Sequence, residues 1–589
     1  MFFSAYLGSP EHEPRWRTHL ERHARWLGLT AHAFSRAVAD GRIFAFGWAS
    51  LRPPDTGALV REEDNHLTII PLDTLTRAEA LAQENPRGFE TNAIRMDVSL
   101  DSGEVRVAVP FLTVEQFYHA GNGGDWVFGN DLRLMLRWAG LRLSELAVYT
   151  LFQYDYVPPP HTLSETVRRI PPGHLLSLPP SGAPSVRRYF RAPEIAGPPE
   201  DGEPLDRIRA ALDGVLARVP ASCAVHFSGG VDSGLIAARL SALGRTDVRL
   251  QNFTAGPNAD PFYNLALDMA AHLDMPCDRV AWNPAEVPEL LGSLAREYAF
   301  PFPDPAILNT LVLVRDMERH GRTLDTVATG TGAAHPFATG FQLADWRRVH
   351  AIPRPLRQLG AAAYIAWFWR GVGTSARVAT AMQRSTQFTV VQNAAFSHGT
   401  LNGLAYDLPP GVRAAMGDAL EEAQSRATEG LIPEDRVALI AILRHAMQMC
   451  GARPFDPLRL RGTLALHAFM EPAVIRTGFS LSWDEKRADG KAKSLLKTLL
   501  AESVPREWVD RKRQPFLLPF RDVYAHPAAQ RLVGDLVLSP ANPLMAFCRP
   551  RDVHRVFSRA IAGQPMNPGA QRFVWAMTTL TLWLEQLNL

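Results

Sequence analysis

The chain has 589 residues, of which 46% are hydrophobic and 21% charged, and its formal net charge is +2. This length exceeds what a single hydrophobic core typically supports, so we expect at least two domains. The nearly balanced charge excludes a bulk attraction to nucleic acid or an anionic membrane. The longest apolar run, residues 360–369, is too short to cross a bilayer, and the N-terminus has no signal-peptide pattern. Four scattered cysteines without a CxxC pair argue against disulfides or zinc and favour a cytoplasmic location.

Short stretches of alternating hydrophobicity predict a β-rich domain in residues 1–190. The predicted strands lie at residues 42–50, 66–70, 93–100, 104–110 and 125–130. Proline and glycine become dense from about residue 173 to residue 205, so we place a linker at 191–204.

Strands alternate with helices beyond the linker. We predict a helix at 205–219, a strand at 223–227, a helix at 232–244, a strand at 248–256 and a helix at 261–275. This order is typical of a parallel sheet. From about residue 300 the pattern is mostly helical. The expected fold class is therefore α/β (α+β overall), with a parallel-sheet domain in residues 205–589.

The stretch FSGGVDSG, residues 227–234, lies between a predicted strand and a predicted helix. Backbone N–H groups at a helix N-terminus attract anions, and two glycines allow close approach and positive φ angles. Ser228 and Ser233 add hydroxyl groups, and Asp232 is an oxygen ligand suited to Mg²⁺. No Gly-Lys-Ser/Thr follows, so this is not a Walker A loop. The competing interpretation is an ordinary strand–helix turn capped by an aspartate.

FSGGVDSG resembles the pyrophosphate-binding turn of the N-type ATP pyrophosphatases, which cleave ATP to AMP and pyrophosphate. Asp131 before a predicted helix, and the stretch Thr162–His174, are similar to the end of the N-terminal domain of asparagine synthetases. Residues 466–481 and 489–516 resemble the C-terminal part of that family. The resemblance implies an Ntn-type, glutaminase-like domain in residues 1–190 and an adenine-nucleotide α-hydrolase-like synthetase domain in residues 205–589.

Position 2 separates this chain from the glutamine-hydrolysing members of that family. Those members use a cysteine there as nucleophile and N-terminal amine, whereas this chain has Phe2 and its first cysteine is Cys223. The resemblance therefore implies a degenerate glutaminase-like domain kept as a scaffold. Members with this defect include β-lactam synthetases, carbapenam synthetases and lasso peptide cyclases, in which an internal amine attacks an adenylated carboxylate. The chain length and the stretch His467–Ile475 look most like the lasso cyclases.

The resemblance also assigns roles to individual residues. Lys493, in KSLLK, aligns with the family's catalytic lysine, and Lys491 is the competing choice; either could instead belong to a solvated helix end. Asp232 would hold Mg²⁺ and take part in catalysis. The residues expected to bind ATP are Ser228, Gly229, Gly230, Asp232, Ser233, Asn252, Phe253, Gly330, Arg511 and Lys512. Arg511, Lys512 and Arg513 could equally solvate a loop.

One segment departs from the family pattern. In ATGTGAAHPFATG, residues 328–340, Thr331 replaces the first functional position and Ala334 replaces the second metal-binding aspartate. Water or phosphate oxygens could complete a Mg²⁺ shell. The adjacent His335 could act as a base for the amine, or it could be a packing histidine.

Three functions remain open at this stage. The first is a lasso peptide macrolactam-forming ligase. It would join an Asp or Glu side chain of a leader-cleaved precursor peptide to the N-terminal amine, with a leader peptidase and a leader-binding protein as further partners. The second is an asparagine synthetase-like ligase that uses ammonia or a small amine. The third is a catalytically impaired binding partner, which only Ala334 favours. Neither nucleic acid nor a membrane is expected as a partner.

Overall fold

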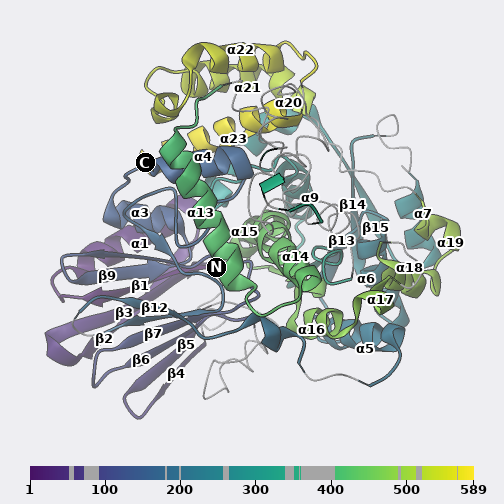
Figure 1. The fold of residues 1–589 in the computed structure, drawn as a ribbon, viewed down its shortest axis with the longest axis horizontal. Coiled ribbons are helices and arrows are strands. Elements are labelled where there is room, and N and C mark those ends of the chain that lie inside the picture. Colours follow the sequence, from purple (N-terminus) through teal and green to yellow (C-terminus); the bar gives the residue numbers. More distant parts are fainter. Residues whose placement is uncertain are drawn as a thin grey trace.

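The computed structural model of the chain contains three β-sheets with helices around them (Figure 1). It describes residues 1–51, 59–71, 92–179, 182–197, 201–256, 264–337, 351–353, 355–356, 359, 405–487, 492–511, 520–566 and 568–588. Within these residues, two sheets are antiparallel and six-stranded, and the third is parallel and five-stranded. The fold is therefore mixed α/β, as the sequence predicts.

The two antiparallel sheets occupy the N-terminal region. The first has the order β10-β8-β9-β1-β3-β2 and the second has the order β12-β11-β7-β6-β5-β4. Their strands are β1 (Phe2–Gly8), β2 (Thr30–Val38), β3 (Arg42–Ser50), β4 (Leu59–Glu63), β5 (His66–Ile70), β6 (Arg95–Ser99), β7 (Val105–Val109), β8 (Tyr118–Asn122), β9 (Asp125–Gly129), β10 (Arg168–Arg169), β11 (His174–Leu178) and β12 (Ser185–Arg188).

Strand β1 is buried on both faces of the first sheet, which explains why nearly all of its residues are apolar. Alternate side chains of a strand point to opposite faces. Phe3 therefore lies in the core with Leu67 and Met96 of the second sheet, whereas Phe2 and Tyr6 lie in a different core with Trp16 of α1 (Glu13–Leu27). The region thus has a helix layer packed on two stacked sheets.

All five predicted strands of this region are confirmed. The dense Pro/Gly stretch is a linker only in part, because β11 and β12 lie within it and pair with each other. Ala192 and Ile195, inside the predicted linker, are buried in a short 3₁₀ turn. The domain boundaries themselves stay a prediction.

The parallel sheet has the strand order β15-β14-β13-β16-β17. Its strands are β13 (Cys223–His226), β14 (Arg249–Thr254), β15 (Cys277–Ala281), β16 (Thr326–Thr329) and β17 (Leu464–His467). The described chain after residue 300 is mostly helical, as predicted, but it also contains the two strands β16 and β17, which the sequence analysis did not predict. Both strands have only four residues, and so short an apolar run cannot be distinguished from part of a buried helix by periodicity.

Helices cover both faces of the parallel sheet. On one face α5 (Pro204–Leu216), α6 (Val231–Ala242) and α18 (Ser494–Ala501) share a core with β13. On the other face α9 (Ile307–Arg319) and α15 (Ala452–Leu460) pack against Ala224, Val327 and Ala465. Further α-helices of the described residues are α3 (Leu132–Ala139), α4 (Glu145–Tyr154), α7 (Leu265–His272), α8 (Val287–Glu297), α13 (Pro410–Ala427), α14 (Pro433–Ala441), α16 (Pro472–Ser480), α17 (Trp483–Lys486), α19 (Arg506–Val509), α20 (Phe520–Ala525), α21 (Pro527–Leu532), α22 (Pro550–Ile561) and α23 (Pro568–Glu585). The segments η5 (Ile442–Gly451) and η7 (Val533–Val537) are π-helical.

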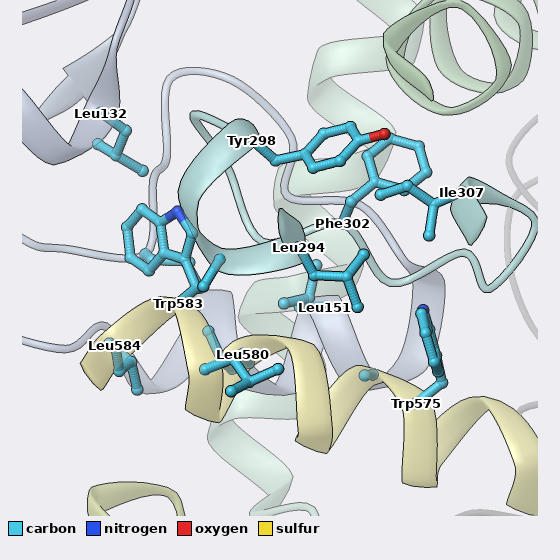
Figure 2. Packing of buried hydrophobic residues seen from close by; sticks show 14 of the residues in the cluster. Leu132, Leu151, Leu294, Tyr298, Phe302, Ile307, Trp575, Leu580, Trp583 and Leu584 are labelled. Atoms are coloured by element: carbon cyan, nitrogen blue, oxygen red, sulfur yellow. The ribbon is translucent and has the colours of Figure 1, made fainter. Parts of the chain in front are cut away.

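One hydrophobic core joins the N-terminal region to the C-terminal helices (Figure 2). Leu151 of α4 belongs to the same cluster as Leu294 of α8 and Trp583 of α23. Arg133 of α3 crosses this junction: it pairs with Asp131 at 2.6 Å and donates to the carbonyl groups at the end of α8. The N-terminal region is therefore anchored to the helices that surround the parallel sheet. None of the helices in the described ranges combines the length and apolar character needed to cross a membrane.

Candidate active site

The order of the parallel sheet reverses at β13. The chain passes from β13 outward to β14 and β15, then returns to the other side of β13 to form β16 and β17. In open α/β sheets, ligands bind outside the carboxyl ends of the strands at such a switch point. The glycine turn after β13 and the segment after β16 both leave the sheet at this switch point. The sheet topology alone therefore indicates a ligand site at the carboxyl ends of β13 and β16.

The turn after β13 has the geometry expected of a phosphate cradle. Gly229 has φ = +65°, and a Cβ atom there would lie 2.9 Å from the Cα of Ala266, so only glycine fits. The Ser233 hydroxyl accepts a hydrogen bond from the Ser228 N–H and lies 3.1 Å from the Ser228 hydroxyl. Gly230 caps α6 without a side-chain bond to the first turn, so backbone N–H groups of that turn remain available to an anion.

Asp232 and Lys493 meet beside this turn. The Lys493 Nζ lies 2.7 Å from each carboxylate oxygen of Asp232. Lys493 has φ = +57° and immediately precedes α18, a left-handed conformation that costs a non-glycine residue about 1–3 kcal/mol. Such a strained conformation persists where the surrounding structure fixes the backbone. Here the conformation directs the Lys493 side chain so that its ammonium group lies at the first turn of α6.

Gly330 brings the end of β16 against the same turn. A Cβ atom at Gly330 would lie 2.8 Å from both the Asp232 Cβ and the Ser233 N. Arg511 approaches from the C-terminal side and donates to the Gly229 carbonyl at 2.7 Å. The glycine turn, Gly330, Lys493 and Arg511 therefore lie together at the start of α6, although they come from four separate stretches of the sequence. The sequence analysis names residues in all four stretches as site candidates. Lys512 lies outside the described residues, as do Lys491 and Arg513.

The remaining sequence candidates are less closely tied to this cluster. Asn252 donates its side-chain amide to the Phe227 carbonyl at 3.0 Å, which links β14 to the end of β13; contact of Asn252 and Phe253 with adenine stays a prediction. His335 lies in the turn after β16, where its backbone N–H donates a hydrogen bond to the Gly332 carbonyl at 3.4 Å. Its role as a base also stays a prediction.

A Mg²⁺ ion would find one carboxylate here. Among the described residues, no group of three or more His, Cys, Asp or Glu side chains is arranged to hold a metal. Mg²⁺ in nucleotide sites is commonly bound by one or two carboxylates together with substrate phosphates and water. Asp232 therefore fits as a single protein ligand, with Ala334 offering no second one.

The sequence analysis assigns no site role to three polar residues at the same edge of the sheet, although one of them begins the stretch His467–Ile475. His226, Thr329 and His467 are the last residues of β13, β16 and β17, and the Thr329 hydroxyl lies 2.8 Å from the His467 Nδ1. Burial lowers the pKa of each histidine to about 4, which keeps both rings neutral at neutral pH. Their proximity follows from strand pairing, so no local motif could have revealed it.

A parallel sheet with a glycine-rich turn and a lysine–carboxylate pair at its switch point is typical of nucleotide-binding proteins of the α/β class. Residues 206–585 match the family model described as asparagine synthase, well over half of the chain. The chain belongs to the asparagine synthase family.

Individual relatives are more distant. The chain is 29% identical over 228 residues to a putative glutamine-hydrolysing asparagine synthetase of Mycobacterium tuberculosis (strain ATCC 25618 / H37Rv), covering 36% of this chain and 33% of the relative. It is 23% identical over 233 residues to glutamine-hydrolysing asparagine synthetase 1 of Bacillus subtilis (strain 168), covering 39% and 36%. The alignments thus span only about a third of the length of these curated relatives.

Solved structures resemble the chain only loosely. A glutamine phosphoribosylpyrophosphate amidotransferase from B. subtilis in complex with ADP and GMP has a TM-score of 0.21 and 10% identity, covering 57% of this chain and 83% of its own. A structure described as the allosteric regulatory enzyme of purine biosynthesis has the same score and identity, covering 38% and 60%.

Proposed function

We propose that the protein is an ATP-dependent carbon–nitrogen ligase that adenylates a carboxylate and lets an amine displace AMP. The observation that carries this proposal is the contact of Lys493 with Asp232 beside the glycine turn. The contact places a cation and a potential metal ligand at an anion-binding helix terminus. Family membership supports the same reaction class.

The reaction would proceed in two steps. The substrate carboxylate attacks the α-phosphorus of ATP and pyrophosphate leaves; the amine then attacks the acyl carbon and AMP leaves. Ser228, Ser233 and the backbone N–H groups after Gly229 would hold the pyrophosphate. Lys493 would face the negative charge that develops at the α-phosphate, because fixed donors and cations act where charge appears in the transition state. Mg²⁺, bound through Asp232, would neutralise phosphate charge.

For the substrate, the proposal is the side-chain carboxylate of an Asp or Glu in a leader-cleaved precursor peptide, joined to that peptide's own N-terminal amine. Residues 1–222 contain no cysteine. Phe2 is fully buried, with its ring centroid 4.9 Å from that of His23. The N-terminal region would thus be a degenerate, glutaminase-like scaffold of Ntn type, and the amine would come with the substrate. A leader peptidase and a leader-binding protein would be further partners, and the cytoplasm the location.

The names of the curated relatives favour a second candidate, a ligase that amidates free aspartate. Without glutamine hydrolysis it would use ammonia or a small amine. The two candidates differ in the carboxylate that they adenylate, a peptide side chain or a free amino acid.

One assay separates these possibilities. The protein is incubated with ATP, Mg²⁺ and peptides that have a free N-terminus and an internal Asp or Glu. We expect AMP formation together with a peptide product lighter by one water, both lost in Lys493→Ala. AMP formed with aspartate and ammonia alone supports the second candidate. Absence of AMP with every substrate contradicts both and favours the catalytically impaired partner suggested by Ala334.

A further inference from the structure

We propose that the carboxyl ends of β13, β16 and β17 form the amine-binding half of the active site, in which His226 accepts the proton released when the amide bond forms. This inference rests on the proposed function and extends it to the second substrate. It concerns a side chain that no motif of the sequence marks.

The strand register places three polar residues in one row. His226 pairs with Thr329 across β13 and β16, and Thr329 pairs with His467 across β16 and β17. Each is the last residue of its strand. Residues at one level of a parallel sheet point to the same face, so the three side chains stand together at the edge where ligands enter such sheets.

This row lies on the face of the sheet opposite α6. Ala224 and Val327 come two residues before His226 and Thr329, and they pack against Val314 of α9. Side chains two residues apart in a strand share a face, so the row lies on the α9 side. The phosphate turn begins α6 on the other side. The amine attacks the acyl carbon from above or below the plane of its carbonyl group, and it needs space that the bound phosphates do not fill. The row would line the part of the site that the phosphate turn leaves open.

His226 has a ring nitrogen ready for a ligand. Its Nε2 is buried and has no hydrogen-bond partner among the described residues, and the residue as a whole is only partly buried. A buried polar atom without a partner is unfavourable, and an incoming N–H would supply the missing hydrogen bond. His467 has a similar Nε2, buried and without a partner among the described residues, but its Nδ1 lies 2.8 Å from the Thr329 hydroxyl, which fixes its ring. The Thr329–His467 pair would fix the row, and His226 would be the group that meets the amine.

The proton transfer balances without any further reactant. The nitrogen lone pair forms the C–N bond, and the bond from the acyl carbon to the AMP oxygen breaks, with its electron pair leaving on AMP. The nitrogen then carries one proton too many, and that proton passes to His226 Nε2 and on to solvent. A neutral imidazole suffices as acceptor, because a nitrogen protonated in this way is a far stronger acid than an imidazolium.

Two half-reactions test the role of His226 once a carboxylate substrate supports turnover. Exchange of labelled pyrophosphate into ATP reports adenylation, and product formation reports amide synthesis. We expect His226→Gln to keep exchange within about twofold while amide synthesis falls about 100-fold, the lower range for loss of a general base. The matched control is His119→Gln, another buried histidine, in β8 of the first sheet; it should leave both rates unchanged. Equal loss of both half-reactions in His226→Gln, or no loss of either, contradicts the proposal.

A binding experiment tests the site without any knowledge of the carboxylate substrate. Glycinamide serves as the amine probe and acetamide, which lacks the amine, as the control. In protein with ¹⁵N-labelled histidine, we expect glycinamide to shift the ring nitrogen signals of His226 saturably and acetamide to leave them in place. The signals that vanish in His226→Gln assign the residue. Absence of a saturable shift overturns the amine site even if adenylation occurs. A shift without adenylation of any carboxylate keeps the site and refutes the proposed function.

Discussion

Lys493 and Asp232 are 261 positions apart in sequence, yet the lysine Nζ lies 2.7 Å from both oxygens of the carboxylate. The left-handed backbone of Lys493 directs its side chain from the start of α18 to the first turn of α6. The ammonium group is thus already in place beside the phosphate turn. In the proposed reaction, the fold would thus hold this charge in place before the substrate binds.

The first prediction concerns this lysine. Lys493→Ala should lower the rate of AMP formation by about 100-fold or more, because it removes the cation that faces the developing phosphate charge. Lys493→Arg should recover part of the rate. The control is Lys497→Ala, one turn along α18, whose partner Asp510 lies at 3.7 Å; it should keep AMP formation near the wild-type rate. Equal activity of Lys493→Ala and the wild type would contradict the assigned role.

The second prediction concerns metal dependence. If Asp232 is the single protein ligand of Mg²⁺, Asp232→Asn should raise the Mg²⁺ concentration needed for half-maximal binding of a fluorescent ATP analogue, by about tenfold or more. Chelation with EDTA should weaken nucleotide binding by the wild type far more than binding by the variant. Asp247→Asn, at a 65% exposed side chain, serves as the control. An unchanged Mg²⁺ requirement in Asp232→Asn would show that the metal is held elsewhere.

The third prediction uses the close contact of β16 with α6. Gly330→Ala would place a methyl group 2.8 Å from the Asp232 Cβ and the Ser233 N, so the backbone must move. We expect a loss of about 1–3 kcal/mol in the free energy of unfolding together with weaker ATP binding. Gly292→Ala in α8 meets no atom within 4 Å and should instead stabilise by about 0.5–1 kcal/mol. Denaturant unfolding of both variants measures the difference, and a stabilised Gly330→Ala would contradict the contact.

The sequence predicts those parts of this fold that are specified locally. FSGGVDSG carries its strand, glycine turn and helix start in one stretch, and His66–Ile70 shows its strand by composition. β16 and β17 were missed because four buried residues have no distinctive period. The row of His226, Thr329 and His467 depends on the register of strands far apart in sequence, since Thr329 and His467 are 138 positions apart. Such a row becomes visible only after the sheet has formed.

The fourth prediction concerns the junction of the N-terminal region with the helices. Arg133 and Asp131 are both fully or almost fully buried and 2.6 Å apart. Arg133→Met would leave the Asp131 carboxylate buried without its main partner, so we expect a loss of about 3–5 kcal/mol in unfolding free energy at pH 7.5. Arg142→Met removes an exposed pair with Glu165 and should cost about 1 kcal/mol or less. Similar unfolding midpoints for the two variants would contradict this prediction.

The last prediction is a pH dependence of stability at His119. Burial, with a smaller effect from Arg168, lowers the pKa of His119 to about 4 in the folded protein, against about 6.5 in the unfolded chain. Between these values the unfolded chain binds the extra proton, so His119 destabilises the fold as pH falls from 6.5 towards 4. Glu115 and Glu471, whose pKa burial raises to about 7, act in the opposite direction, so the pH dependence of wild-type stability does not report His119 alone.

The difference in unfolding free energy between His119→Gln and the wild type, followed with pH, isolates the contribution of the histidine. From pH 7 to pH 5 the variant should gain about 2 kcal/mol of unfolding free energy relative to the wild type, measured by urea unfolding at each pH. A difference that stays constant with pH would mean that His119 titrates alike in both states.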